Sequence, residues 1–300
     1  MITKTLSGLV FLDEPYGGVY AGRSVLVCGR SGTGKTAVGF HFVQQGLQQD
    51  DRCLILSTMQ ANDLTILGES LGFALTVPVD RGDLILLEYE SFVPGRALAW
   101  NTIPAEGFNQ LREIIERNSV TRVMLDTVLP WVTVASNEHM AEQVFSFVRS
   151  CDRLGITTLM TMPKPVSSMA FRLKKAVETV TPVSVLLSPS ENGNHCVWQT
   201  VKYLGEKNPV GAAPYMIEQG KGIVPLQPGS PTEEQQPGGS REAAPESGGG
   251  HKPIRFSSKI SPSSRDPSPG SGSTSDAAQA KPRPPGPARL ANVWKPNADA

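Results

Sequence analysis

The sequence has no long apolar segment and no net charge. It contains no stretch of about 18 apolar residues that could cross a bilayer, and its N-terminus lacks the basic-then-apolar pattern of a signal peptide. Its 28 lysines and arginines balance its 28 aspartates and glutamates. The charge therefore gives no indication of a nucleic-acid partner or an acidic substrate. We expect a cytoplasmic protein that does not bind membranes and is not primarily a nucleic-acid binder.

Cysteine and histidine are also scarce, and neither shows the spacing of metal ligands. Cys28 and Cys53 lie in apolar segments and are expected to be buried core thiols. The four histidines have no metal spacing and no obvious acidic partner. We therefore assign no metal or catalytic role to Cys28, Cys53, Cys151, Cys196, His41, His139, His195 or His251.

The composition changes at Gln227. Residues 1–226 alternate apolar runs with polar turns, whereas residues 227–300 are rich in Pro, Gly and Ser, with Phe256 and Trp294 as their only aromatics. Such a segment cannot bury enough apolar surface to offset the entropy lost on ordering. We predict one domain over residues 1–226 and a disordered tail over residues 227–300.

Strands and helices alternate along the domain, which favours an α/β fold with a mainly parallel sheet. Predicted strands are Ser24–Cys28, Cys53–Ser57, Leu84–Leu87, Arg122–Asp126 and Thr157–Thr161, followed by an antiparallel pair at Val183–Leu187 and Cys196–Lys202. Predicted helices are Ala37–Leu47, Asp63–Leu71, Pro104–Asn118 and Glu138–Leu154.

A phosphate-binding loop of the form G-x-x-x-x-G-K-[ST] joins the first strand to the first helix. Glycines let successive backbone N–H groups face an anion, and the helix N-terminus adds partial positive charge. Lys35 would reach the β- and γ-phosphates of a nucleotide, and the Thr36 hydroxyl would ligate Mg²⁺. An ordinary Gly-rich turn is the alternative, but the strand–loop–helix context favours ATP–Mg²⁺ binding. The loop residues are Gly29, Arg30, Ser31, Gly32, Thr33, Gly34, Lys35 and Thr36.

Asp126 ends the fourth predicted strand. An aspartate at the carboxyl edge of a parallel sheet is the residue with which P-loop proteins hold Mg²⁺. The alternative is that Asp126 only caps the following turn. With the phosphate-binding loop upstream, we expect Thr36 and Asp126 to form the metal site.

These segments, taken in order, resemble the KaiC-like branch of the RecA-type ATPases from about Leu6 to Leu226. The resemblance implies a RecA-like P-loop core, with a twisted and mainly parallel sheet flanked by helices. It also implies a homo-oligomeric ring, usually of six subunits, with nucleotide between neighbours. The segments that carry it are Gly17-Gly18, Gly22–Thr36, Leu125–Thr127, Gly155–Thr161, Pro214–Ile217 and Gly222–Leu226.

Two catalytic features of that family are missing. Thr58 and Met59 stand where the family has a glutamate pair that activates water, and neither side chain can act as a general base. The family's Lys-x-Arg-Gly, which reaches the neighbour's phosphates, is here Lys202-Tyr203-Leu204-Gly205, so Lys202 remains and Leu204 replaces the arginine. Loss of an arginine finger costs about 10³–10⁵ in rate. We assign no catalytic residue.

The sequence therefore predicts an ATP-binding regulatory or signalling protein with slow or absent hydrolysis. One alternative is an active ATPase or autokinase of the same family that uses another base. A second is a RadA-like DNA-recombination ATPase. The basic run Arg172–Lys175 would serve the second alternative, but a solvated helix face is the favoured interpretation, because no aromatic or Gly-rich segment accompanies the run.

The end of the predicted tail has a different composition. Residues 288–296 concentrate Leu, Val and Trp in an otherwise polar stretch. Short apolar motifs in disordered tails often dock into a groove of a partner. We expect Leu290–Trp294 to contact a protein, with a chance cluster as the alternative.

Overall fold

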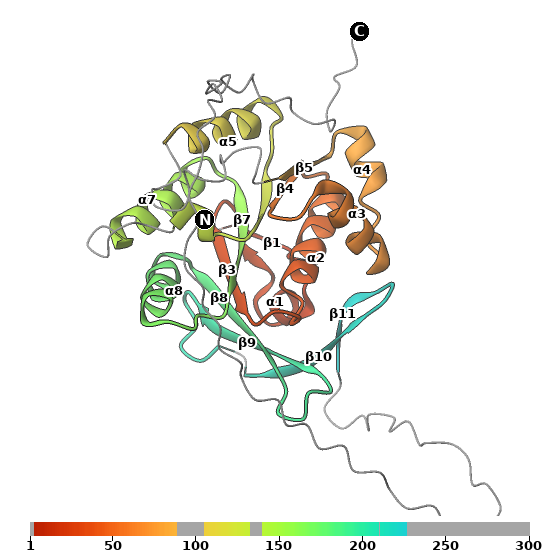
Figure 1. The fold of residues 1–300 in the computed structure, drawn as a ribbon, viewed down its shortest axis with the longest axis vertical. Helices are drawn as coiled ribbons and strands as arrows, with labels where there is room; N and C mark the ends of the chain where they lie inside the picture. Colours follow the sequence, from red (N-terminus) through yellow and green to blue (C-terminus); the bar gives the residue numbers. More distant parts are fainter. Residues whose placement is uncertain (1–2, 89–104, 133–139, 210, 227–300) are drawn as a thin grey trace, which may run out of the picture. The chain divides into compact units, whose positions relative to one another are not determined.

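The computed structural model describes residues 3–88, 105–132, 140–209 and 211–226. Nine strands of this part form one sheet in the order β11-β10-β9-β8-β3-β7-β6-β4-β5 (Figure 1). The strands are β3 (Ser24–Gly29), β4 (Cys53–Ser57), β5 (Leu84–Glu88), β6 (Arg122–Asp126), β7 (Thr157–Pro163), β8 (Val183–Pro189), β9 (Cys196–Tyr203), β10 (Ala213–Glu218) and β11 (Gly222–Pro225).

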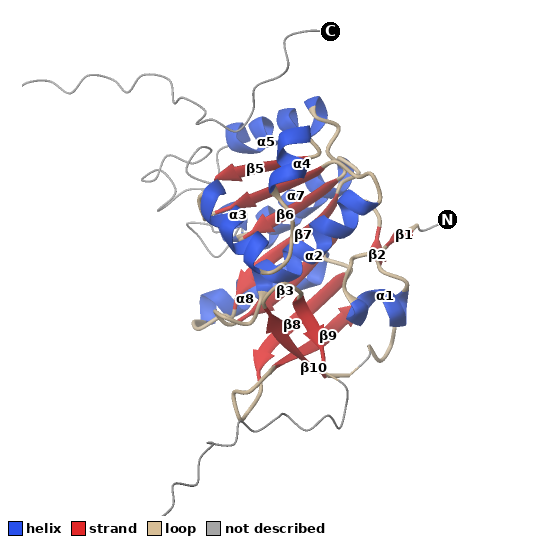
Figure 2. Cartoon of the chain, turned by 90° about the vertical axis from the view of Figure 1, so that its right-hand side faces the viewer, coloured by secondary structure: helices blue, strands red, loops and turns tan. Residues whose placement is uncertain are grey.

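The strands from β8 to β5 pair in parallel, and β8, β9, β10 and β11 pair antiparallel. Figure 2 shows the parallel strands running in one direction, with α1 and a small second sheet near their starting ends. That second sheet is the antiparallel pair β1 (Lys4–Thr5) and β2 (Val19–Tyr20). The predicted α/β class, with a mainly parallel sheet, is confirmed.

Helices cover both faces of the large sheet (Figure 1). On one side lie α1 (Val10–Tyr16), α2 (Lys35–Gln48), α3 (Ala61–Ser70) and α4 (Thr76–Arg81). On the other lie α5 (Ala105–Arg117), α6 (Leu129–Val132), α7 (Met140–Arg153) and α8 (Ser168–Val180). Each face of the sheet has its own hydrophobic core under the helices that cover it. Alternate residues of one strand pack into the two cores, because successive side chains point to opposite faces of the sheet. Thus Val25 and Val27 of β3 join the α2 side, and Leu26 joins the α7 side.

A buried arginine holds the start of β6 to α2 and to the N-terminal segment. The Arg122 side chain is 1% exposed, and its Nε donates to Asp51 Oδ2 at 3.0 Å. One terminal nitrogen donates to the carbonyls of Leu6 and Phe42 at 3.0 and 2.9 Å. The other donates to Thr5 Oγ1 and Gln49 Oε1 at 3.0 and 2.9 Å. All the N–H groups of the guanidinium therefore have partners, as burial of a charge requires.

The predicted strands are all present, and most run one or two residues further than expected, up to Pro163 in β7 and Pro189 in β8. The predicted antiparallel pair is confirmed as β8 and β9. Helices α1, α4, α6 and α8 were not among the predicted helices, although the run Arg172–Lys175 within α8 was interpreted as a helix face. The expected helix starts at Pro104 and Glu138 fall outside the described residues.

The predicted burial of Cys28 and Cys53 is confirmed. Burial also raises the pKa of the Cys53 thiol to about 12, which suits a core thiol rather than a nucleophile. The predicted tail, residues 227–300, and its apolar motif at 288–296 lie outside the described residues. Among the described helices, none is long and apolar enough to span a membrane.

Candidate nucleotide site

The phosphate-binding loop leaves β3 at the carboxyl edge of the sheet and enters α2. Gly32 and Gly34 have φ of 79° and 81°, a left-handed conformation that glycine adopts without a steric cost. A Cβ on Gly34 would also stand 2.8 Å from Ile217 Cδ1 of β10. The left-handed backbone angle therefore favours glycine at position 34, and the contact with the end of the Ile217 side chain adds a smaller cost.

The loop presents backbone donors to solvent. Thr33 N donates to the carbonyl of Arg30 at 3.4 Å, and Thr33 Oγ1 donates to the same oxygen at 2.8 Å. Within the described part of the chain, the N–H groups of Ser31, Gly32 and Gly34 donate to no acceptor. Free N–H groups at a helix N-terminus form an anion-binding site.

Lys35, the first residue of α2, lies at the same place. Its Nζ donates to the carbonyl of Arg30 at 2.8 Å, so the ammonium stays with the loop. Burial lowers the pKa of Lys35, and the negative charge of Asp126 opposes that shift. A phosphate oxygen is a stronger acceptor for this ammonium than a neutral carbonyl, because it is charged.

Asp126 ends β6 next to the start of α2. Its Oδ2 accepts from Thr36 Oγ1 at 2.9 Å, across 90 residues of sequence. Its Oδ1 accepts from Thr161 Oγ1 at 2.6 Å, at the carboxyl end of β7. The two hydroxyls fix the carboxylate at the loop, where the sequence placed Asp126 and Thr36 together.

These oxygens fit Mg²⁺. A carboxylate and a hydroxyl are hard oxygen ligands, and Mg²⁺ in nucleotide sites takes only one or two protein ligands besides phosphate and water. Across the described residues no three His, Cys, Asp or Glu side chains gather as a metal centre. Thr36 and Asp126 could therefore hold Mg²⁺ together with a bound nucleotide.

The hairpin of β10 and β11 holds the phosphate-binding loop and α2 in place. Tyr215 of β10 is fully buried, and its hydroxyl donates to the carbonyl of Thr33 at 2.5 Å. On the neighbouring strand, Ile223 N donates to His41 Nε2 of α2 at 2.9 Å. Strands more than 180 residues from the loop therefore fix both the loop and the helix that follows it.

Thr58 and Met59 follow β4, one strand beyond Asp126. Ser57, the last residue of β4, is level with Asp126 on β6 and with Glu88 on β5. Thr58 is exposed and Met59 half-buried, and Met59 packs against the core on the α2 side. At the two positions that the sequence aligned with the glutamate pair, this edge of the sheet therefore presents a hydroxyl and a thioether, and neither group can act as a general base.

Glu88 is a carboxylate at the end of the neighbouring strand β5. Its Oε1 accepts from the backbone N–H of Ala61 at 2.9 Å, at the N-terminus of α3. A carboxylate in this position satisfies a free helix donor and complements the helix dipole. The contact gives Glu88 a structural function at α3.

Lys202 and Leu204 are far from the loop of their own chain. Lys202 is paired with Ser184, which is level with Leu26 of β3, about 10 Å before the loop begins. Its Nζ donates to the carbonyls of Glu178 and Thr179 at 2.7 and 3.1 Å, at the end of α8. The Leu204 side chain is 53% exposed. Neither residue can contact a nucleotide bound to its own chain.

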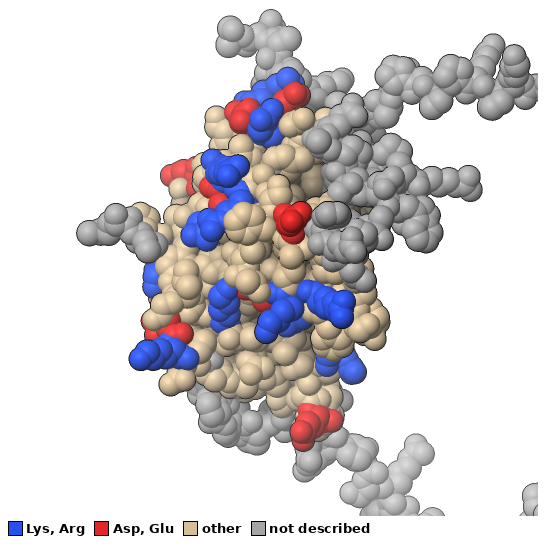
Figure 3. Space-filling model, turned by 90° about the vertical axis from the view of Figure 1, so that its left-hand side faces the viewer, with Lys and Arg blue, Asp and Glu red and all other residues tan. Residues whose placement is uncertain are grey.

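The basic run Arg172–Lys175 lies on the solvent side of α8. Arg172 and Lys175 are exposed, Lys174 pairs with Glu178, and Leu173 is buried. Figure 3 shows lysine and arginine side chains across the middle of the face that carries α7 and α8, with acidic groups among them. The run is thus the polar side of an amphipathic helix.

Sequence reasoning missed two residues of the site, Thr161 and Tyr215. Thr161 is the last residue of a predicted strand, and its position at the carboxyl edge of the sheet was the only feature of the sequence that could have indicated a role in the site. Tyr215 lies near the loop because of the order of the strands in the sheet, and no local sequence pattern specifies that order.

Three comparisons bear on this chain. The family model described as "ATPase: KaiC" matches residues 5–229. The circadian clock oscillator protein KaiC of Thermostichus vulcanus is 25% identical over 228 residues, which cover 72% of this chain and 43% of that protein. KaiC of Parasynechococcus marenigrum is 28% identical over 158 residues, which cover 50% of this chain and 30% of that protein. The chain therefore matches less than half the length of these relatives.

The fold is also found in a solved structure. The KaiC-like protein PH0186 of the hyperthermophilic archaeon Pyrococcus horikoshii OT3 superposes with a TM-score of 0.61 at 17% sequence identity. The superposition covers 76% of this chain and all of that one. At this identity the likeness shows the fold.

Proposed function

Because the chain belongs to the KaiC family of ATPases, we propose that it binds ATP–Mg²⁺ and hydrolyses it slowly or not at all. Its nucleotide state would then serve as a regulatory signal. The observation that carries the proposal is the contrast between the two parts of the site. The loop, Lys35, Thr36 and Asp126 lie together at one edge of the sheet, whereas Thr58 and Met59 are the residues that we align with the missing base.

Binding uses groups that are already oriented. The phosphates take the free N–H groups of the loop, and Lys35 exchanges the Arg30 carbonyl for a phosphate oxygen. Thr36 and Asp126 would hold Mg²⁺, which would supply positive charge to the phosphate oxygens. Thr161 keeps the carboxylate of Asp126 in position.

Hydrolysis requires a base to orient and deprotonate water. The Thr58 hydroxyl is too weak an acceptor, and the Met59 thioether carries no titratable proton. Glu88 is held at the N-terminus of α3 by Ala61 N–H. Thr58, Met59 and Glu88, as the structure describes them, therefore supply no base that would make phosphoryl transfer to water fast.

We also propose that the chain assembles into a homo-oligomeric ring with the nucleotide between neighbours. Lys202 faces away from its own loop and would serve the site of the adjacent subunit. Leu204, exposed beside it, supplies no charge to the transition state. The Leu290–Trp294 segment is proposed as a protein contact.

Equilibrium binding and single-turnover hydrolysis, measured on one preparation, test the function. We expect saturable ATP binding and phosphate release slower than about 1 s⁻¹ per subunit, the lower end of ordinary turnover. Faster release would show that another residue acts as the base, as in an active ATPase or autokinase.

A designed variant tests the reason for slow hydrolysis. Thr58→Glu with Met59→Glu should raise the single-turnover rate, and adding Leu204→Arg should raise it further in the assembled protein. The matched control is Thr76→Glu on α4, which adds a carboxylate outside the site. Unchanged rates in both designed variants would contradict the assigned positions of the missing base and arginine.

A further inference from the structure

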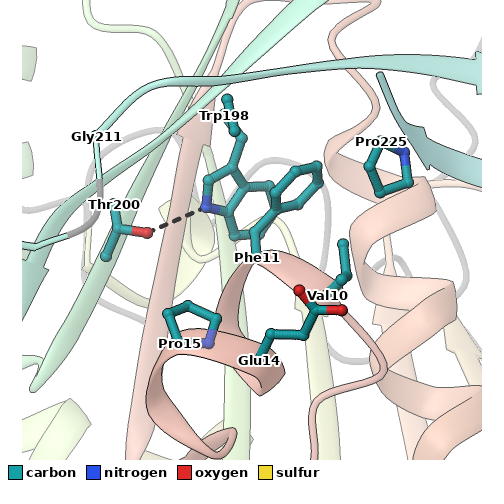
Figure 4. A pocket seen from close by; sticks show the side chains of 9 residues that line it. Val10, Phe11, Glu14, Pro15, Trp198, Thr200, Gly211 and Pro225 are labelled. Carbon is teal, nitrogen blue, oxygen red and sulfur yellow. Dashed lines mark hydrogen bonds between the residues drawn. The ribbon is translucent and has the colours of Figure 1, made fainter. Parts of the chain in front are cut away.

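An apolar pocket unrelated to the phosphate-binding loop lies between α1 and the start of β10 (Figure 4). Its volume is about 420 Å³, in the range of small ligand sites. Six of its lining residues matter here, and they are Val10, Phe11, Glu14, Pro15, Trp198 and Pro225.

The floor of the pocket is aromatic and has no free donor. Phe11 stacks on Trp198 with ring centroids 5.0 Å apart, and Figure 4 shows the two rings against each other at its centre. Trp198 Nε1 already donates to Thr200 Oγ1 at 3.1 Å. The floor therefore favours an apolar or aromatic occupant over a polar one.

The rim carries one negative charge. Glu14 is exposed, and its carboxylate has no ion-pair partner within the described part of the chain. An occupant that places a cation beside an aromatic side chain would match both the rim and the floor.

We propose that this pocket holds the Leu290–Trp294 segment of the same chain, with Trp294 on the Phe11–Trp198 pair and Lys295 beside Glu14. This inference rests on the protein contact proposed above, and it names the partner of that segment. In residues 227–300 Trp294 is the only tryptophan, and Leu290, Val293 and Lys295 accompany it. An aromatic side chain followed by a lysine matches the aromatic floor and the acidic rim of the pocket.

The course of the chain favours this occupant. Pro225 ends β11 and also lines the pocket, so the chain leaves the domain at the pocket rim. The segment begins 65 residues later, from 290 − 225. A Gly-rich chain of that length spans roughly 45 Å, which keeps its end at an effective concentration on the order of a millimolar. A weak contact is then occupied without a second molecule.

Photo-cross-linking of the full chain tests the proposal. With p-benzoylphenylalanine in place of Trp294, irradiation should yield cross-links to Val10–Pro15 or Trp198 in a product of monomer mass. The yield should be at least five times that from the same label in place of Ala277. Equal yields from the two positions would overturn the proposal, and a product of dimer mass would assign the pocket to another copy and overturn it too.

A charge exchange keeps the test specific. Glu14→Lys should lower the cross-link yield at least threefold, and Lys295→Glu in that background should restore it. Glu191→Lys, on the exposed turn before β9, is the matched control and should change nothing. No effect of Glu14→Lys, or no recovery in the exchanged pair, would reject the assigned orientation.

The outcomes also separate this inference from the proposed function. A label at position 294 that cross-links to a different protein, and not to the pocket, rejects the inference and supports the proposed contact. If the label at position 294 cross-links neither to the pocket nor to another protein, both the inference and the proposed protein contact are rejected. ATP binding by the same labelled chain tests the nucleotide site independently of either result.

Discussion

Lys35 is the lysine of the phosphate-binding motif, and its ammonium group stays at the loop through a hydrogen bond to the Arg30 carbonyl. Removing it deletes the charge that would meet the β- and γ-phosphates. We predict that Lys35→Ala weakens ATP binding at least tenfold, which corresponds to about 1.4 kcal/mol.

Titration with a fluorescent ATP analogue measures this effect. Lys175→Ala on the exposed side of α8 is the control for loss of a positive charge and should bind as wild type does. Equal affinities of the Lys35 variant and wild type would reject the proposed site.

His41 makes the free energy of unfolding depend on pH, and this dependence has no catalytic origin. Burial lowers its pKa from 6.5 to about 4, and its Nε2 accepts from Ile223 N–H, which protonation would prevent. The unfolded chain therefore takes up this proton at a higher pH than the folded chain. The free energy of unfolding is unaffected above pH 6.5 and falls as the pH drops towards 4, by up to about 3 kcal/mol.

Urea unfolding at pH 7 and pH 4.5 measures this loss. In His41→Gln, whose amide oxygen can still accept from Ile223 N–H, the pH-dependent loss should shrink by most of that amount. A variant that loses as much stability as wild type between the two pH values would show that other groups cause the dependence.

At the scale of elements, one side chain ties three segments together. Arg122 joins β6 to α2 and to the N-terminal segment. Gly46 of α2 leaves room for the Arg122 side chain, because a Cβ at that position would lie 2.5 Å from Arg122 Cδ. We predict that Arg122→Met lowers the free energy of unfolding by about 3–5 kcal/mol, since it leaves buried acceptors and Asp51 without their partner.

Denaturant titration checks the value against Arg117→Met, a variant of an exposed arginine at the end of α5, which should change stability by less than about 0.5 kcal/mol. A loss for Arg122→Met as small as for Arg117→Met would mean that the buried network contributes little.

Most elements with a strong local pattern were predictable, and short ones were not. The exception is α8, a helix of 13 residues of which only the basic run was interpreted as helical. Strands β3, β4 and β6 are runs of apolar residues with clear ends, and α2 and α7 show helical spacing of their buried residues. In contrast, α1 and α4 contain proline and have seven and six residues, and α6 has four. Such helices depend on packing rather than on propensity, so no sequence window reveals them.

The residues of the candidate site also differ in whether a local sequence pattern predicts them. The loop and Asp126 belong to local patterns, a glycine-rich motif and an apolar run that ends in a carboxylate. Thr161 and Tyr215 take part through strand order, because β7 lies between β3 and β6 and the last hairpin returns to the loop. The position of a strand within a sheet is a tertiary property that the sequence did not reveal.

For the whole molecule, the relationship expected from the order of motifs is confirmed, both by the KaiC family match and by the RecA-type arrangement of the sheet. If nucleotide lies between subunits, ATP binds the assembled form more tightly than the monomer. We predict by linkage that ATP–Mg²⁺ increases the mass in solution.

Light scattering with and without ATP–Mg²⁺ measures that mass. Lys35→Ala should show no increase, because it cannot bind the ligand that drives association. A monomer at high micromolar concentration under both conditions would contradict the proposed ring.

The bond from Tyr215 to Thr33 also bears on the order in which the protein is made. Its two ends lie 182 positions apart, so the phosphate-binding loop leaves the ribosome long before the strand that holds it. Chains emerge N-terminus first, at about 5–20 residues per second. During synthesis the loop therefore remains unsupported until β10 has been made. Residues 227–300 are translated after that point, so the nascent domain can close around its loop while synthesis of the chain continues.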